Sequence, residues 1–323
     1  MTTGTGAVIG GRRDRAGRRP RHGRAGIAAA LAVLALTGCT AQAAGGTPQP
    51  RETGPRDTDR PVTSPTPKPT ATPPRTLDGI RVNIAEGQTV GVGMPVSVTF
   101  DRPVPAGERA DVERQLKVTA AGVRGSWSWV RDRNLHDGQR VDFRPREHWA
   151  PGTEVTVRAG AGITRHFTVG RSLVATVDVR SHTMTVDKGG EKRTVPITAG
   201  APGMDTWNGT MVVLDKQRRV FMDSRTVGYG DAYAGYYDYA VHLTTSGTYL
   251  HQNPKANTYA GRRNVTHGCV GLATDGTARR FYDEVIPGDV VRVTGSAETV
   301  DAGNGYGGWN LSWKDWRAGS ALD

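Results

Sequence analysis

The chain has 323 residues, of which 36% are hydrophobic, and its formal net charge is +11. This length predicts two globular domains with additional segments, and abundant glycine with few aromatic residues favours short strands over helices. The first 38 residues hold seven arginines and one aspartate, and residues 39–76 hold five basic and three acidic residues, which leaves +3 for residues 77–323. The charge therefore gives no support to nucleic-acid binding by the folded part.

Residues 1–38 have the composition of an export signal. A basic start is followed by an apolar run over residues 26–36, which at eleven residues is too short for a stable membrane-spanning helix but fits a signal-peptide core. The run ends in Leu36-Thr-Gly-Cys39, which looks like a bacterial lipobox. We expect Cys39 to become the lipid-modified mature N-terminus, so that the protein is exported and anchored to the outer face of the cell membrane, in the cell-wall zone. Ordinary cleavage after Ala44 is the alternative.

Residues 39–76 form a predicted disordered tether. They contain nine prolines among Thr, Ser and charged residues, and almost no large apolar side chain that could offset the entropy of folding. The two cysteines of the chain are Cys39 and Cys269. If Cys39 carries lipid, Cys269 has no disulfide partner, and a lone thiol in an exported protein suggests a reactive group.

Residues 77–170 predict an antiparallel β-sandwich. Apolar residues recur with a period of two in several short runs that turn signals separate. The alternating positions are Val96, Val98 and Phe100; Trp127 and Trp129; Val141 and Phe143; and Val155 and Val157. No residues in this region have the spacing of a metal site or of a nucleophile.

Residues 171–296 predict a second β-rich domain with one main helix. Asp187-Lys-Gly-Gly190 is a strong hairpin signal between two alternating runs. After Thr274 or Asp275, either of which can cap a helix, apolar residues recur at helical spacing up to Val285. Residues 297–323 contain three tryptophans at spacings of four and three, and we expect this tail to pack on the second domain.

The chemistry-bearing stretch runs from Tyr249-Leu-His251 to Thr266-His-Gly-Cys269. Cys269 offers a sulfur nucleophile, His251 or His267 a base, and the amides around Gly268 donors for an oxyanion. A cysteine at a glycine turn with histidine beside it is a poor candidate for a core residue, so a catalytic thiol is the favoured interpretation.

These residues resemble the signature of the L,D-transpeptidases of bacterial cell walls, a histidine followed after a gap by Ser/Thr-His-Gly-Cys and an apolar residue. His251, the gap 252–265 and Thr266-His-Gly-Cys269-Val fit it throughout. The resemblance extends over 77–323 and is strongest to the actinobacterial two-domain lipoproteins. It implies a mainly β chain, with an Ig-like sandwich at 77–170, a YkuD-type catalytic domain at 171–296 and a tryptophan-rich tail at 297–323.

The resemblance also implies roles for single residues. His251 would be the base, oriented by the backbone carbonyl of Gln252, while His267 shapes the turn. A lid at 220–240 would place Met222 and Tyr236 beside the donor path, with the Tyr236 hydroxyl possible as an additional oxyanion donor. The expected substrate-binding residues are Met222, Tyr236, Asn264, Thr266 and His267. Gly271 stands where this branch usually has Asn, so any substrate contact of that side chain is absent.

By the same resemblance, the substrate would be peptidoglycan. Cys269 would take a tetrapeptide stem with release of D-Ala and pass it to the side-chain amine of a neighbouring stem, forming a 3→3 cross-link, and carbapenems would acylate the same sulfur. No metal or cofactor is expected. The alternatives are an L,D-carboxypeptidase, an enzyme that attaches proteins to the wall, a decayed wall-binding lipoprotein, and a different Cys-His hydrolase.

Overall fold

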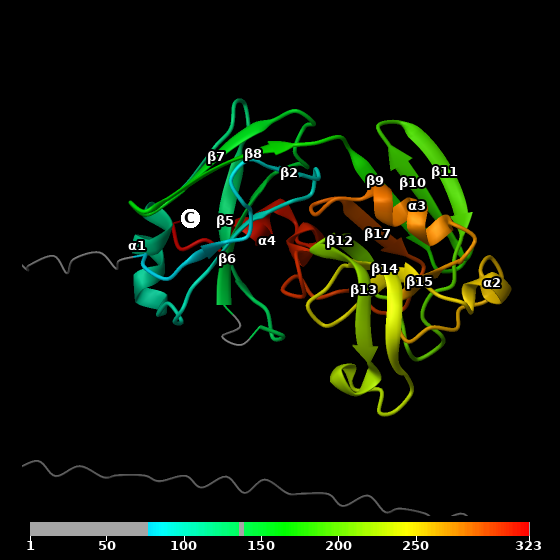
Figure 1. Ribbon diagram of the computed structural model, residues 1–323. Helices are drawn as coiled ribbons and strands as arrows, with labels where there is room; N and C mark the ends of the chain where they lie inside the picture. Colours follow the sequence, from blue (N-terminus) through cyan, green and yellow to red (C-terminus); the bar gives the residue numbers. More distant parts are fainter. Residues whose placement is uncertain (1–76, 136–138, 323) are drawn as a thin grey trace, which may run out of the picture. The chain divides into compact units, whose positions relative to one another are not determined.

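Short strands with alternating burial build the two β-rich parts of the chain, in agreement with the predicted mainly β fold (Figure 1). The computed structural model describes residues 77–135 and 139–322, and all of these belong to one compact unit. The predicted signal peptide, the tether and Cys39 lie outside the described residues. No helix in the described part is long and apolar enough to span a membrane.

The first part, called here the N-terminal sandwich, consists of two four-stranded sheets with a shared hydrophobic core. One sheet has the order β1 (Arg81–Val82), β3 (Val96–Thr99), β6 (Gln139–Pro145) and β5 (Gly125–Arg131). The other has the order β2 (Gln88–Val90), β8 (Ile163–Val169), β7 (Glu154–Ala159) and β4 (Leu116–Thr119), and the short helices η1 (Ala106–Glu108) and α1 (Arg109–Arg114) precede β4. Phe143 pairs in register with Val96 on one side and Trp127 on the other, and all three side chains are buried. The predicted period-two pattern thus forms the core of the sandwich.

The second part, β9–β17, again contains two sheets around one core. The first has the order β11 (Glu191–Pro196), β10 (Thr183–Lys188), β9 (Leu173–Asp178), β17 (Val290–Thr294) and β12 (Gly209–Val212). The second has the order β13 (Asp215–Asp223), β14 (Ala234–His242), β15 (Tyr249–Gln252) and β16 (Val270–Leu272). The predicted hairpin joins β10 to β11, and positive φ angles at Gly189 and Gly190 (62° and 97°) suit its two-residue turn.

The predicted main helix is α3 (Thr277–Glu284), which contacts β14 and β15 and buries Ala278 and Phe281 in the core of the second part. Its N-cap is Gly276, but Asp275 Oδ1 accepts a hydrogen bond from the amide of Thr277, 3.0 Å away. Two further short helices complete this part: η2 (Ser224–Val227) follows β13, and α2 (Ala256–Tyr259) follows β15. The β13–η2–β14 hairpin corresponds to the region in which a lid was expected.

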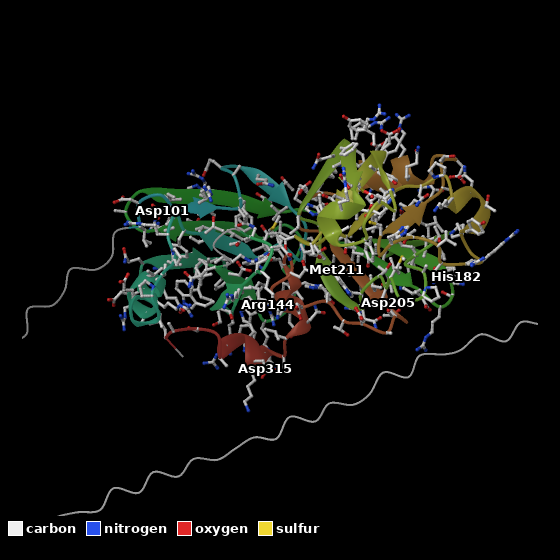
Figure 2. The ribbon with its side chains drawn as sticks, turned by 90° about the horizontal axis from the view of Figure 1, so that it is seen from below. Asp101, Arg144, His182, Asp205, Met211 and Asp315 are labelled. Carbon is white, nitrogen blue, oxygen red and sulfur yellow. The ribbon has the colours of Figure 1, made fainter. Side chains whose placement is uncertain are left out.

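The C-terminal tail forms η3 (Gly307–Asn310) and α4 (Trp313–Arg317) and contacts both parts. Asn310 hydrogen-bonds the backbone of Thr210 in β12, as expected for a tail on the second part. The tail also covers the N-terminal sandwich, because the rings of Trp309, Trp313 and Trp316 surround the guanidinium of Arg144 at 4.7–5.4 Å. In Figure 2, Arg144 lies above the red tail segment that carries Asp315.

Candidate active site

Parallel pairing of two short strands brings the ends of the sequence motif together. His251 lies in β15, and Cys269 directly precedes β16, which runs parallel to β15 with Gly271 opposite His251. The pairing of β15 with β16 therefore brings His251 and Cys269 together although seventeen residues separate them in the sequence. Both side chains line one cavity of about 80 Å³, which is open to solvent.

The sulfur of Cys269 is almost buried, with 9% of the residue exposed, and forms no disulfide. Burial raises the pKa of this thiol to about 11, although a hydrogen bond from the Tyr249 amide lowers it in part. The thiol also lies 3.9 Å from the carbonyl oxygen of Gly247, to which it can donate. The turn that precedes β15 thus contacts the sulfur with both a donor and an acceptor.

The imidazole of His251 is held by its own strand. Its Nδ1 lies 2.7 Å from the carbonyl oxygen of Gln252, and since a carbonyl can only accept, Nδ1 carries the proton of the neutral ring. This leaves Nε2 without a proton, the form that a general base needs. Burial lowers the pKa of His251 to about 4, so the ring is neutral at pH 7. The predicted backbone contact of Gln252 is present.

The protonation states of Cys269 and His251 limit how the two groups can react, because the thiol and the imidazole are both neutral at pH 7. The sulfur is a weak nucleophile until a base removes its proton, and the two shifted pKa values make a stable thiolate–imidazolium pair unfavourable before substrate arrives. If Cys269 attacks a carbonyl carbon, a base must therefore remove the thiol proton as the attack takes place.

The turn before Cys269 is shaped by two residues of the motif. Gly268 has φ of +102°, a conformation that disfavours residues with a side chain. Thr266 is buried, and its hydroxyl donates to the carbonyl oxygen of Cys269 at 2.6 Å. Among the described residues, the amides of Gly268 and Cys269 have no hydrogen-bond acceptor. They are therefore available as donors for an oxyanion.

His267 separates the cavity of Cys269 from a second cavity, and it lines both. Its ring lies 5.7 Å from that of Tyr229 and 5.3 Å from that of Tyr233. Burial, followed by the charge of Lys255, lowers its pKa. These contacts agree with a shaping role, whereas His251 has the orienting hydrogen bond that suits the base.

The structure places Tyr236, a predicted substrate-binding residue, outside the cavity of Cys269. In β14 this residue pairs with Phe221, its ring packs on Phe221 with centroids 5.2 Å apart, and 65% of it is exposed. Tyr237 points to the opposite face and lines the cavity, because successive residues of a strand alternate between faces. Met222 lines the cavity as predicted.

Asn264, the other predicted substrate-binding residue outside this cavity, contacts neighbouring segments of the chain. Its Oδ1 accepts from the amide of Ala199 at 2.9 Å and lies 3.0 Å from Nδ1 of His182, while its Nδ2 donates to the carbonyl of Val179 at 2.9 Å. The side chain therefore ties the turn to neighbouring backbone and lines neither cavity beside Cys269.

Six residues that line the cavity were not predicted from the sequence: Ala232, Tyr233, Tyr237, Asn253, Lys255 and Val265. The alternating pattern of residues 234–242 could have indicated Tyr237, since Tyr237 lies on the strand face that points inward. Asn253 follows β15 and had no such signal. No cluster of three or more potential metal ligands occurs in the described parts of the chain.

Comparison with known families agrees with this geometry. Residues 55–162 match the family described as bacterial Ig domain, and residues 172–293 match the L,D-transpeptidase catalytic domain. The chain is 37% identical over 220 residues to L,D-transpeptidase 1 of Mycobacterium tuberculosis, a match that covers 66% of this chain and 84% of the relative. It is 32% identical over 256 residues to L,D-transpeptidase 2 of the same species, covering 73% of this chain and 60% of that relative.

Solved structures give the same result. The chain is similar to the LD transpeptidase LdtMt1 in complex with imipenem, with a TM-score of 0.60 and 34% identity over 67% of this chain and 99% of the other. It is also similar to L,D-transpeptidase 3 from Mycobacterium tuberculosis, with a TM-score of 0.58 and 30% identity over 67% and 99%. The chain spans about 60% of the length of the longer relatives, L,D-transpeptidases 2 and 5.

Proposed function

The chain belongs to the L,D-transpeptidase family, and from that premise we propose that it cross-links peptidoglycan by acyl transfer through Cys269. The observation that carries the proposal is that Cys269 and His251 line one open cavity, while Nδ1 of His251 is engaged by the Gln252 carbonyl. This arrangement matches the needs of a thiol nucleophile with a general base.

In the first half-reaction, the sulfur of Cys269 attacks the carbonyl carbon between the third residue of a tetrapeptide stem and its terminal D-Ala. His251 Nε2 takes the thiol proton as the C–S bond forms, and the amides of Gly268 and Cys269 stabilise the oxyanion. The C–N bond then breaks, and the same proton goes to the amine of the leaving D-Ala. The stem remains on the enzyme as a thioester.

In the second half-reaction, the side-chain amine of an acceptor stem attacks the thioester carbon. His251 takes a proton from this amine and returns it to the sulfur as the C–S bond breaks, so the enzyme is restored and a 3→3 cross-link is formed. His267 lines both the cavity of Cys269 and the neighbouring one. Tyr233 lines both cavities as well, and the acceptor stem would enter through the neighbouring one.

The cavity and the relatives also support acylation by carbapenems. LdtMt1 has been solved in complex with imipenem, and L,D-transpeptidase 3 with a faropenem-derived adduct. We propose that the strained amide of such compounds is opened here by Cys269 in the same way as a stem peptide.

The decisive experiment combines purified tetrapeptide dimers with mass spectrometry of the products. A cross-linked product with loss of D-Ala supports the transpeptidase, whereas loss of D-Ala without a cross-link indicates an L,D-carboxypeptidase. Transfer of the stem to a protein amine would indicate attachment of proteins to the wall. Absence of any product and of any imipenem adduct would indicate a decayed binding protein. Cys269→Ala is expected to lose both product and adduct, with an unchanged circular dichroism spectrum.

We further propose that the protein acts outside the cell as a lipoprotein. The support is the sequence alone: the basic start, the short apolar run and Leu36-Thr-Gly-Cys39. Intact-mass measurement of the membrane fraction tests it, since diacylglycerol on Cys39 adds a mass that Cys39→Ala removes. A mature N-terminus near Gly45 would contradict the anchor.

A further inference from the structure

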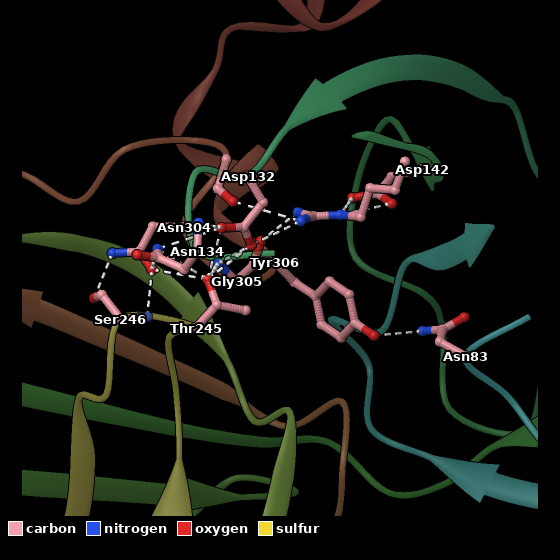
Figure 3. Close-up of polar contacts among 11 residues, drawn as sticks. Asn83, Asp132, Asn134, Asp142, Thr245, Ser246, Asn304, Gly305 and Tyr306 are labelled. Carbon is pink, nitrogen blue, oxygen red and sulfur yellow. Dashed lines mark hydrogen bonds and ion pairs between the residues drawn. The ribbon is translucent and has the colours of Figure 1, made fainter. Parts of the chain in front are cut away.

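A buried polar network joins the N-terminal sandwich to the turn that contacts the sulfur of Cys269 (Figure 3). Its centre is Asp132, which lies between β5 and β6 and is fully buried. Arg140 holds this carboxylate at 3.0 Å, and the Nε of Arg140 contacts both oxygens of Asp142 at 3.0 and 2.9 Å. Arg140 also donates to the carbonyl of Gly305. The buried charges are therefore paired and fixed in place.

Asp132 reaches the second part of the chain through Thr245. The hydroxyl of Thr245 lies 2.9 and 2.7 Å from the two carboxylate oxygens, to which it donates, and it accepts from the amide of Gly305 at 3.1 Å. The next residue is held as well, because the amide of Ser246 donates to Asn304 Oδ1 at 3.1 Å. Thr245 and Ser246 are thus both held by side chains that lie outside the sheet β13–β16.

The turn itself is tight, so a displacement of Thr245 must be transmitted along it. The amide of Gly247 donates to the carbonyl of Thr244, and the amide of Thr248 donates to the hydroxyl of Thr244, both at 2.9 Å. Gly247 has φ of +96°. The turn ends at Gly247 and Tyr249, whose carbonyl and amide contact the sulfur of Cys269.

We propose that Asp132 is a positioning residue for the nucleophile: through Thr245 it fixes the turn 244–249 against the sulfur of Cys269. The N-terminal sandwich would then set the geometry of the reacting thiol as well as space the protein from its surroundings. Asn134 of the same loop lines the cavity on the far side of His267, together with Thr245, Ser246 and Gly247. The second cavity is therefore built from both parts of the chain.

This inference rests on the proposed function. Its first measurement is therefore one that does not require transpeptidase activity, so that the two can fail separately. Iodoacetamide alkylation of Cys269 is followed against pH by mass spectrometry of the tryptic peptide 264–279, which excludes any signal from Cys39. The test variant is Thr245→Val, which removes the hydroxyl, nearly preserves the volume and leaves the pairing of Arg140 with Asp132 and Asp142 intact. Asp132→Asn is the second variant, in which the buried ion pair is also weakened.

The matched control is Tyr306→Phe. It removes another hydrogen bond between the tail and the N-terminal sandwich, from the Asn83 amide to the Tyr306 hydroxyl at 2.9 Å, but does not touch the turn 244–249. A merely structural role predicts that all three variants lose thermal stability while the alkylation midpoint of Cys269 stays constant.

The positioning role predicts a different result. Thr245→Val and Asp132→Asn should lower the pH midpoint of alkylation. If the turn is released, the thiol becomes more exposed to water, and its burial is the main cause of its raised pKa. They should also reduce kcat with a tetrapeptide donor about 10- to 100-fold with little change in KM, the cost of misplacing a reacting group. The double variant should be no worse than the more affected single one, because both act through one contact.

Tyr306→Phe should leave the midpoint and kcat unchanged. A midpoint and a kcat equal to those of the unaltered protein in folded Thr245→Val would overturn the inference. If the unaltered protein forms no cross-link, the proposed function fails, while the alkylation midpoint still decides the role of Asp132.

Discussion

The ring of Tyr237 lies edge-on to the imidazole of His251, with centroids 4.7 Å apart and an interplanar angle of 72°. Both side chains line the cavity of Cys269, so the tyrosine separates the base from solvent on the side of the β13–β14 hairpin. Burial is the main reason why the pKa of His251 is lowered to about 4. Tyr237 therefore contributes to the neutral state of the base.

Replacing Tyr237 by alanine is expected to raise the pKa of His251 towards its ordinary value of 6.5, because water then reaches the ring. Loss of the aromatic contact should lower kcat/KM for the donor about 3- to 10-fold. NMR titration of His251 and donor kinetics test both effects. Tyr236→Ala is the matched control, since the neighbouring ring points to the exposed face and should change neither quantity. Equal effects of the two substitutions would contradict the assignment.

The same pair of tyrosines shows how far the sequence could locate the site. The motif from His251 to Cys269 could be predicted because its residue types and spacing are visible in the sequence. The parallel pairing of β15 and β16, which brings the two ends of the motif together, is seen only in the structure. The resemblance implied Tyr236, whereas Tyr237 lines the cavity. The face of β14 on which each residue lies is set by the register with β13, which an error of one position reverses.

Contacts between distant segments explain the other differences. Asn264 binds the backbone of Val179 and Ala199, far away in sequence, so no local pattern distinguishes it from a substrate ligand. The hairpin at Gly189-Gly190 was predictable because its turn chemistry is local. The tryptophans of the tail converge on Arg144, although a break at Leu311-Ser312 separates them into two short helices instead of one.

The stability of the protein should fall on both sides of a plateau between about pH 6.5 and 9, the ordinary pKa values of His and Cys. His251 has a folded pKa of about 4, below its ordinary value, so the unfolded chain binds the extra proton as the pH falls from 6.5 to 4. Cys269 has a folded pKa of about 11, above its ordinary value of 9, so the unfolded chain loses its proton first as the pH rises. Each effect amounts to about 3 kcal/mol when complete.

Urea unfolding at a series of pH values measures these two limbs. His251→Gln should flatten the acid limb, and Cys269→Ala should flatten the alkaline limb, because each removes the group that titrates differently in the two states. An alkaline limb that persists unchanged in Cys269→Ala would show that the thiol is not responsible for it.

Gly271 packs against Asn253, which lines the cavity of Cys269, and leaves no room for a side chain of its own. A Cβ atom at Gly271 would lie 3.0 Å from the Cβ and 3.2 Å from the Nδ2 of Asn253, and 2.9 Å from a methyl group of Thr198. Asn253 lines the cavity, and its Oδ1 accepts from the amide of Lys255, which leaves the Nδ2 group to face a substrate. We therefore expect Asn253→Ala to raise the KM for the donor about fivefold, the effect of one lost neutral hydrogen bond.

Gly271→Ala tests the packing in the same place. The added methyl group should destabilise the protein by about 1–3 kcal/mol, because it would meet a methyl group of Thr198 and the Cβ of Asn253, which cannot rotate away. Thermal unfolding measures this loss, and Gly162→Ala is the control for packing, because no atom lies within 4 Å of the added Cβ there and φ is not positive. A KM for Asn253→Ala equal to that of the unaltered protein would remove Asn253 from the substrate site.

Thr266 fixes the carbonyl of Cys269 from the other side of the turn. Its hydroxyl donates at 2.6 Å, while Thr206 contributes only a long contact of 3.5 Å to the same oxygen. Thr266→Val keeps the shape and loses the donor, so the protein should lose about 1–2 kcal/mol of stability in urea unfolding. Imipenem adduct formation should also slow, because the backbone that presents the sulfur and the oxyanion amides is no longer held.

Thr266→Ser separates these causes, since it keeps the hydroxyl and removes a buried methyl group. If the hydrogen bond sets the geometry of Cys269, the serine variant should form the adduct at nearly the rate of the unaltered protein, even if it is somewhat less stable. Intact-mass time courses with imipenem measure both rates on folded protein. A serine variant as slow as the valine variant would assign the effect to packing of the methyl group, and a valine variant of unaltered rate would show that the turn holds Cys269 without Thr266.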